Sequence, residues 1–147
     1  MKNVTVGRTV AAPRAAVWAV LADYPNIADW NVGVEKSYAI GDLTEGVGAV
    51  RHCDLTVGAM DETVTTWVDE KTMVIALSEI QKHPLKQAEM TFTLADDGPG
   101  TTVTMSYNFE PKGGPFSSVV AAMLKRPMNK GFNSFIDDLE AEAQARA

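Results

Sequence analysis

Residues Val10–Trp30 read VAAPRAAVWAVLADYPNIADW and determine how the N-terminal quarter of the chain folds. Pro13 fits the first turn of a helix, where a missing N–H is tolerated, and apolar residues follow it at helical spacing. These residues are Val17, Trp18 and Leu21. The Tyr24-Pro25 pair ends this helix, because a proline pushes the residue before it out of the α region, and Pro25 can open a second short turn. The stretch therefore predicts two short helices directly after a first strand.

An antiparallel sheet is predicted on both sides of this stretch. Residues 2–10 alternate loosely between apolar and polar types, and from Gly33 onward glycines and acidic turns recur about every 10–14 residues, as in a meander. We expect the six later strands near residues 34–40, 47–54, 60–68, 72–81, 87–95 and 101–109. The last two alternate cleanly, so one face of each meets an apolar interior. Their inward residues are Ala88, Met90, Phe92, Leu94, Val103, Met105, Tyr107 and Phe109.

The C-terminal segment predicts one long helix over residues 115–144, about 40–45 Å in length. Its apolar residues follow a helical stripe. They are Phe116, Val120, Met123, Leu124, Met128, Phe132, Phe135, Ile136 and Leu139. Pro127 lies inside this helix and is expected to kink it, because a proline removes one hydrogen bond and clashes with the preceding turn. The kink and Gly131 favour open space beneath the helix.

Composition limits the class of protein and its partners. A chain of 147 residues with a formal charge of −6, a pI of about 4.8 and no lysine/arginine cluster is a poor match for nucleic acid or anionic membranes. One cysteine cannot form an internal disulfide, and the N-terminal residues lack the apolar core of a signal peptide, so we expect a cytoplasmic protein. No apolar run approaches the roughly 18 residues of a membrane span, so no membrane insertion is expected.

The pattern Ala12-Pro13-x3-Val17-Trp18-x2-Leu21-x-Asp23-x6-Trp30 resembles the N-terminal signature of the START-like (SRPBCC) helix-grip superfamily. That superfamily includes the polyketide cyclase/dehydrase and lipid-transport group, pathogenesis-related pollen allergens and abscisic-acid receptors. The similarity continues through residues 46–51, 62–64, 69–70 and the final helix.

The resemblance implies an α+β fold in which a seven-stranded antiparallel sheet curls around the long C-terminal helix, with two short helices after the first strand. We expect a single START-like domain over residues 1–147. The space between sheet and helix would be a cavity for a hydrophobic ligand, closed at one end by the two short helices. Trp18 and Trp30 are then expected to be core residues packed beneath the end of the sheet.

The strand at 60–68 has two possible orientations. Either Glu62, Val64, Thr66 and Val68 face inward, or Asp61, Thr63, Thr65 and Trp67 do. We favour the first, because the abscisic-acid receptors point the glutamate that matches Glu62 toward their ligand, and this leaves Trp67 outside. The strand at 72–81 is apolar on both faces, so its outer face could join Trp67 in a patch that suits a homodimer. Monomer and homodimer both remain open.

Two connections are expected to frame the mouth of the cavity, residues 55–59 and residues 82–85. The resemblance to abscisic-acid receptors makes them the equivalents of a gate and a latch, with His83 and Leu85 at latch-like positions. The first loop is shorter and lacks the gate proline, and Val32 stands where those receptors carry a ligand-binding lysine. The sequence therefore favours mouth loops but not a hormone receptor.

We predict a ligand site built from the inner face of the sheet, the second mouth loop and the last helix. Its methionines are flexible and can adapt to ligands of different shapes. Its residues are Glu62, Val64, Thr66, His83, Leu85, Ala88, Met90, Met105, Tyr107, Val120, Met123, Leu124 and Met128. No metal or cofactor is expected, because metal ligands are not clustered and neither a nucleophile elbow nor a dinucleotide fingerprint is present.

The favoured function is binding or transport of a small hydrophobic molecule, such as a lipid, polyketide or aromatic metabolite. The alternative is a polyketide cyclase or dehydratase that uses Glu62 or His83 as acid–base residues, with Tyr107 as a third candidate. A third possibility is a protein-interaction module.

Overall fold

The computed structural model describes residues 1–147 and contains one seven-stranded antiparallel sheet with the strand order β1-β7-β6-β5-β4-β3-β2. The strands are β1 Lys2–Val10, β2 Val34–Ile40, β3 Val50–Leu55, β4 Ala59–Val68, β5 Thr72–Gln81, β6 Leu85–Asp97 and β7 Gly100–Pro111. The helical elements are α1 Arg14–Ala22, η1 Tyr24–Asp29, η2 Gly114–Phe116 and α2 Ser117–Arg146. The expected helix-grip fold is confirmed.

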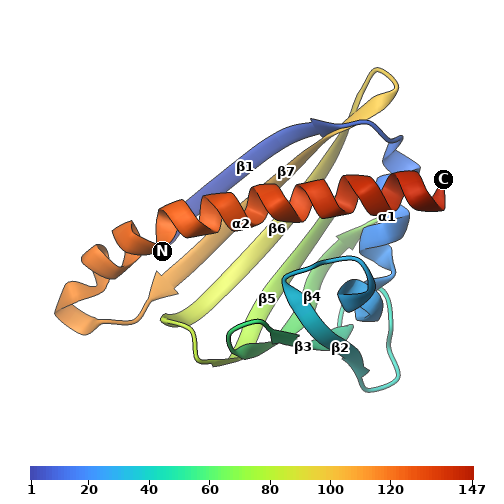
Figure 1. Ribbon diagram of the computed structural model, residues 1–147. Helices are drawn as coiled ribbons and strands as arrows, with labels where there is room; N and C mark the ends of the chain where they lie inside the picture. Colours follow the sequence, from blue (N-terminus) through green and yellow to red (C-terminus); the bar gives the residue numbers. More distant parts are fainter.

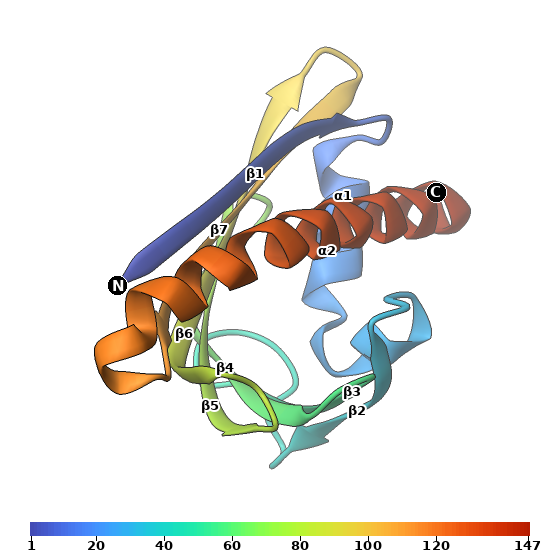
Figure 2. The same cartoon turned by 60° about the vertical axis from the view of Figure 1, so that its left-hand side comes forward.

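The sheet curls around α2, which lies along its concave side (Figure 1). In the turned view the two edge strands β1 and β2 come to lie on opposite sides of this helix (Figure 2). Helix α1 and the η1 turn cover the end of the sheet where α2 ends, and Arg146 bonds Asp23 there at 3.1 Å. The two short helices predicted from Val10–Trp30 therefore form the closed end of the molecule.

The hydrophobic core lies between the inner face of the sheet, α1 and the C-terminal half of α2. The alternation predicted for β6 and β7 is confirmed, because their inward residues are buried, apart from a partly exposed Met90. Phe135 of α2 packs between Trp30 at 5.1 Å and Phe92 at 5.4 Å between ring centroids. Trp18 and Trp30 are both buried, as expected for core residues.

Strand β4 contains a bulge that changes which face its side chains occupy. Val64 pairs with the buried Ile75 of β5, but the register then shifts and Trp67 pairs with the buried Met73. Thr65 is left without a ladder partner on β5, although its hydroxyl donates to the Val74 carbonyl at 3.4 Å. One extra residue on one strand reverses the facing of every later side chain on it.

The bulge corrects the orientation predicted for residues 60–68. Glu62 faces inward as expected, but Thr66 and Val68 lie on the outer face, where Val68 is 46% exposed. Trp67 turns inward and its ring meets Trp18 at 5.3 Å in an edge-to-face contact. The expected outer patch around Trp67 was therefore wrong, and the argument for a homodimer contact loses its basis.

Candidate functional site

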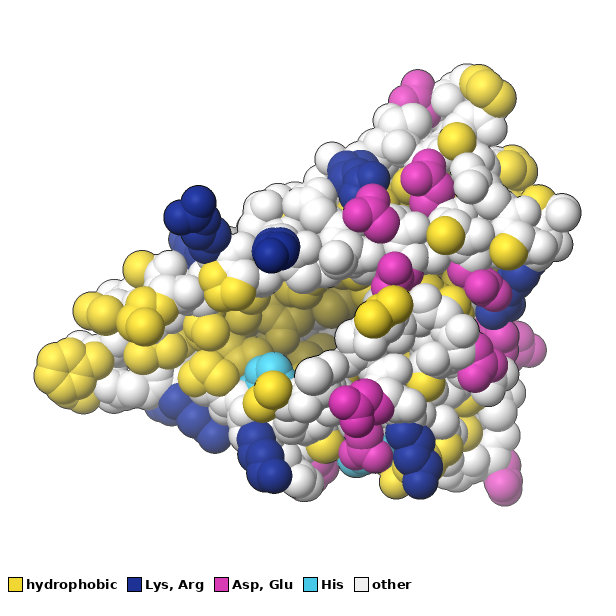
Figure 3. Space-filling view, viewed as in Figure 1, with side chains coloured by type: hydrophobic (Ala, Val, Ile, Leu, Met, Phe, Trp, Pro, Cys, Tyr) yellow, Lys and Arg dark blue, Asp and Glu magenta, His cyan; other side chains and the backbone are white.

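A hydrophobic hollow opens between α2 and the strands that α2 does not cover (Figure 3). Helix α2 packs on β1, β7 and α1. Met90 lies on the inner face of β6 between the buried Ala88 and Phe92, yet it remains partly exposed. Because an inward side chain in the middle of a strand is reached by solvent only through open space, the hollow extends to Met90. Leu124, Met128 and Phe132 of α2 are also only partly buried.

The two predicted mouth loops lie side by side at the entrance. Gly58 takes a φ of +86°, and a Cβ at this position would overlap the carbonyl oxygen of Gln81 and lie 2.8 Å from His83 Cδ2. The second loop is tied to the segment before α2, since Lys112 N–H donates to the Pro84 carbonyl at 2.9 Å. These loops and the start of α2 thus form one rim. His83 Nε2 is buried there without a hydrogen-bond partner.

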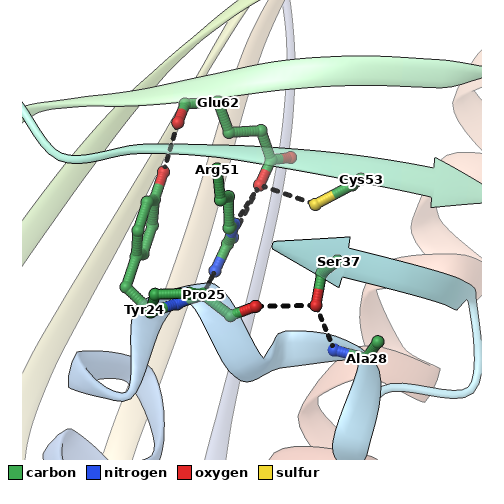
Figure 4. A network of polar contacts seen from close by, with 7 residues as sticks. All are labelled: Tyr24, Pro25, Ala28, Ser37, Arg51, Cys53 and Glu62. Atoms are coloured by element: carbon green, nitrogen blue, oxygen red, sulfur yellow. Dashed lines mark hydrogen bonds and ion pairs between the residues drawn. The ribbon is translucent and has the colours of Figure 1, made fainter. Parts of the chain in front are cut away.

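A buried polar cluster occupies the inner face of β3 and β4 next to η1 (Figure 4). Arg51 contacts Glu62 Oε1 through Nε at 2.7 Å and through Nη2 at 2.6 Å, and its Nη1 donates to the Tyr24 carbonyl at 2.9 Å. Its guanidinium also lies 3.9 Å from the centre of the Tyr24 ring. Cys53 Sγ lies 3.8 Å from the same Glu62 oxygen. The cluster arises because β3 and β4 pair Arg51 directly with Glu62 and alternation turns Cys53 to the same side.

Burial and the ion pair set the protonation of this cluster. Burial lowers the pKa of Arg51, but the charge of Glu62 and the neighbouring Tyr24 and Cys53 outweigh it and raise the pKa overall. The thiol pKa of Cys53 is raised to about 12, first by burial and then by Glu62. Burial likewise raises the pKa of Tyr24 well above its usual range. Arg51 is therefore a permanent cation, and Cys53 is a neutral thiol rather than a nucleophile.

Two polar groups on the inner face of the sheet have no partner within the protein. All polar contacts of the Glu62 carboxylate are made by Oε1, which leaves Oε2 free. Tyr107 pairs with Met90 across the β6–β7 ladder, and its hydroxyl makes no hydrogen bond within the chain and is not sealed from solvent. Burial, followed by the charge of Glu62, raises the pKa of Tyr107, so its hydroxyl keeps its proton. A carboxylate oxygen and a phenol thus remain available to a ligand.

The other predicted site residues fall into four groups. Val64, Leu85, Ala88 and Met105 are buried on the inner side, and Val120, Leu124 and Met128 are partly buried on α2. Thr66 lies on the outer face because of the bulge. Met123 is 72% exposed, so its predicted place in the wall was wrong: it lies on the opposite side of the helix from the buried Ala121, where no strand covers it.

Three members of the polar cluster were not predicted as site residues, Tyr24, Arg51 and Cys53. The sequence carried a signal for Cys53, because it shares the parity of Arg51, but none for Tyr24, whose place depends on how η1 turns. Ser37 of β2 fixes that turn by donating to the Pro25 carbonyl at 2.8 Å and accepting from Ala28 N–H at 3.0 Å (Figure 4).

Two further features bear on cofactors and membranes. The structure has no group of three or more His, Cys, Asp or Glu side chains placed to share a metal ion. None of its helices combines the length and hydrophobicity of a membrane span.

Comparison with known proteins identifies similar chains. A family model described as polyketide cyclase / dehydrase and lipid transport matches residues 1–144. A protein from Thermus thermophilus has a similar structure with a TM-score of 0.83 and 18% identity, covering 99% of both chains. The Zhui aromatase/cyclase from Streptomyces sp. R1128 gives a TM-score of 0.78 and 17% identity over 99% of this chain and 94% of that one.

A START superfamily protein from Mycobacterium smegmatis is also similar, with a TM-score of 0.80 and 16% identity over 99% of both chains. At these identities the structural likeness shows the fold. No curated protein sequence matches this chain significantly.

Proposed function

The chain belongs to the polyketide cyclase / dehydrase and lipid transport family, and from that premise we propose that it binds a small, mainly hydrophobic molecule between the sheet and α2. The observation that carries the proposal is the partial exposure of Met90 in the middle of the inner face, which marks open space where the rest of the sheet is packed. A concave, mostly apolar site with a few directed polar groups is how small-molecule sites are usually built.

The polar end of the hollow suggests the chemical class of the ligand. Glu62 Oε2 can only accept a hydrogen bond while ionised, and the Tyr107 hydroxyl can donate or accept. A ligand hydroxyl satisfies both, because it donates to the carboxylate and accepts from the phenol. We therefore expect an aromatic or aliphatic body that carries a hydroxyl at its buried end.

Binding of the apolar body is tested with Nile red and with organic extraction of the purified protein followed by mass spectrometry. Nile red fluorescence should rise on addition of the protein. Replacing Met128 with tryptophan fills the hollow and should abolish most of this rise, whereas the matched Met123→Trp variant, altered on the exposed side of the same helix, should behave like the wild type. A folded protein that neither carries a ligand nor takes up the dye overturns the proposal.

The polar end is tested with naphthol and naphthalene, which differ by one hydroxyl. Tyr107→Phe should weaken naphthol binding about fivefold, because a net hydrogen bond is worth on the order of 1 kcal/mol, and should leave naphthalene binding unchanged. Tyr38→Phe, on the exposed outer face of β2, is the control. Equal naphthol binding by the Tyr107 variant and the wild type contradicts the assignment of this group.

A cyclase or dehydratase activity is the second candidate, and it is supported by the two unpartnered polar groups on the inner face, Glu62 Oε2 and the Tyr107 hydroxyl. The two candidate functions differ in what happens to the bound molecule. A carrier releases the extracted ligand unchanged, whereas a dehydratase releases it less one molecule of water. If mass spectrometry detects conversion and Glu62→Gln converts at the wild-type rate, Glu62 is not the acid–base residue.

A further inference from the structure

The η2 turn and the first turns of α2 expose large hydrophobic side chains instead of burying them. Phe116 is 69% exposed, Val119 58% and Met123 72%. Val119 and Met123 are four apart, so they lie on one side of the helix, opposite the buried Ala121, and Phe116 is the last residue of the η2 turn directly before it. Figure 3 shows hydrophobic side chains covering the end of the molecule where α2 begins.

The same segment carries positive charge only. Residues 111–136 contain Lys112, Lys125, Arg126 and Lys130 and no aspartate or glutamate, although the whole chain has a formal charge of −6. None of these four side chains takes part in an ion pair. In contrast, Arg8, Arg14, Arg51 and Arg146 are all paired with carboxylates.

The charges and the exposed hydrophobic residues occupy one continuous surface. Arg126 follows Met123 by three positions and Lys130 follows Arg126 by four, so both continue the stripe of Val119 and Met123 along the helix. A shallow surface pocket, separate from the hydrophobic hollow, lies at Pro127. It is lined by Lys125, Arg126, Pro127, Asn129 and Lys130. We call the surface formed by Phe116, Val119, Met123, Arg126 and Lys130, with Lys112 and Lys125 beside it, the basic tip.

We propose that the basic tip docks the protein onto an anionic lipid surface. Exposed hydrophobic side chains framed by lysine and arginine fit the boundary between lipid headgroups and acyl chains, where cations meet phosphates. The negative charge of the whole chain does not oppose this contact, because charges more than about 8 Å away are largely screened at physiological ionic strength. The proposal thus differs from the expectation drawn from net charge alone, and the contact is peripheral, without insertion of a membrane span.

A second copy of the chain fits the basic tip less well. Symmetric pairing through this surface would set its unpaired cations against the same cations of the other copy. The position of the basic tip also suits a lipid surface, because Lys112 is bonded to the loop that forms the rim of the hollow. A hydrophobic ligand could then enter or leave without crossing water.

Vesicle sedimentation of the ligand-free protein tests the proposal independently of the hollow. The wild type should bind vesicles of phosphatidylcholine mixed with phosphatidylserine, bind phosphatidylcholine alone far more weakly, and lose binding as salt is added. The Arg126→Ala/Lys130→Ala variant should bind the anionic vesicles about 25-fold more weakly, or about fivefold per charge. Phe116→Ala should weaken binding several-fold at every salt concentration.

The matched control is Lys36→Ala/Lys71→Ala, which removes two exposed cations distant from the basic tip. Lys36 lies on the edge strand β2. Lys71 follows Glu70, whose carbonyl accepts a hydrogen bond from Arg14 of α1. Lys71 therefore lies near the C-terminal end of α2, whereas the basic tip is at its N-terminal end. This variant should bind as the wild type does. The proposal is overturned if the wild type does not bind anionic vesicles, or if both double variants lose vesicle binding equally. It is also overturned if sedimentation velocity shows a dimer that only the tip variant loses. Dye uptake unchanged in the tip variant separates this outcome from a failed ligand site.

Discussion

The two halves of α2 have the same secondary structure but opposite surroundings. From Phe132 to its C-terminus the helix buries Ile136, Leu139 and Ala143 completely against the sheet and α1. From Ser117 to Gly131 it buries only Ala121 and leaves Met123 largely in solvent. Hydrophobic residues occur in both halves, so composition does not explain the contrast. It depends on what lies beneath each half.

This contrast shows how one helix can both stabilise the fold and leave room for a ligand. The closed end, where α1, η1 and the second half of α2 meet, contains the packed aromatic contacts and the Arg51–Glu62 pair. The open end contains the mouth loops and the less buried first half of α2. Regions with few buried contacts open at low free-energy cost, and binding regions are commonly drawn from them.

The largest expected effect is at the polar cluster of the closed end. Arg51→Met leaves the Glu62 carboxylate buried without its cation and should lower the free energy of unfolding by about 3–5 kcal/mol in urea denaturation followed by circular dichroism. The double variant Arg51→Met/Glu62→Met removes both charges and should recover most of the loss. A loss below about 1 kcal/mol in the single variant would show that solvent reaches the pair.

A matched pair of substitutions tests the two halves of α2 directly. Ile136→Ala should cost about 2–5 kcal/mol of unfolding free energy, because it removes a fully buried side chain and leaves a cavity. Met123→Ala should change stability by less than about 0.5 kcal/mol, as at other exposed positions. Both values come from urea midpoints measured side by side. Comparable losses in the two variants would mean that the first half of the helix is also packed.

The mouth loops should show an intermediate effect. Gly58→Ala introduces a side chain at a φ of +86° and against the Gln81 carbonyl, so we expect a loss of about 1–3 kcal/mol in urea unfolding. Gly98→Ala is the control, because Gly98 also has a positive φ of +60° but has open space around it, and its loss should be smaller. Equal losses would assign the effect to backbone conformation alone.

Much of the architecture could be predicted from the sequence because it depends on local signals. Pro13 and Pro25 mark the helix boundaries, and the strict alternation at 87–95 and 101–109 gives the inward face of two strands that the structure confirms. The bulge at Thr65 was missed because no glycine or proline marks it. It arises from how β4 fits β5, and one unmarked residue was enough to misplace Thr66 and Trp67.

The candidate site was harder to predict because its geometry is not local. Glu62 was correctly placed facing inward, but its orientation is fixed by Arg51 across the ladder and by Tyr24 from a separate element. Met123 was placed in the wall because the apolar stripe of the helix continues through it. Periodicity shows that a face is hydrophobic, but it does not show whether a strand lies beneath that face.

The smallest expected effect lies on the outer face of β3, one residue from Arg51. His52 lies between Asp61 at 2.7 Å and Asp54 at 2.9 Å, and it stacks on Tyr38, which Lys36 approaches from β2. Hydrogen bonds to Asp61 and then Asp54 raise the pKa of His52. The folded protein therefore holds this proton more tightly than the unfolded chain does.

The sign of the pH dependence follows from this raised pKa. The stabilisation from His52 is complete below the unfolded pKa of about 6.5 and is lost as the pH rises through the folded pKa. Because 19% of the His52 side chain and 44% of the Asp54 side chain are exposed, it should be worth no more than about 1 kcal/mol. Urea unfolding of His52→Gln and the wild type should differ by this amount at about pH 5.5 and converge by about pH 9. A difference that stayed constant with pH would show that His52 stabilises the fold by packing on Tyr38 and not by its charge. The inner face of β3, with the Arg51–Glu62 ion pair, and the outer face, with His52, would then differ in the kind of interaction as well as in solvent exposure.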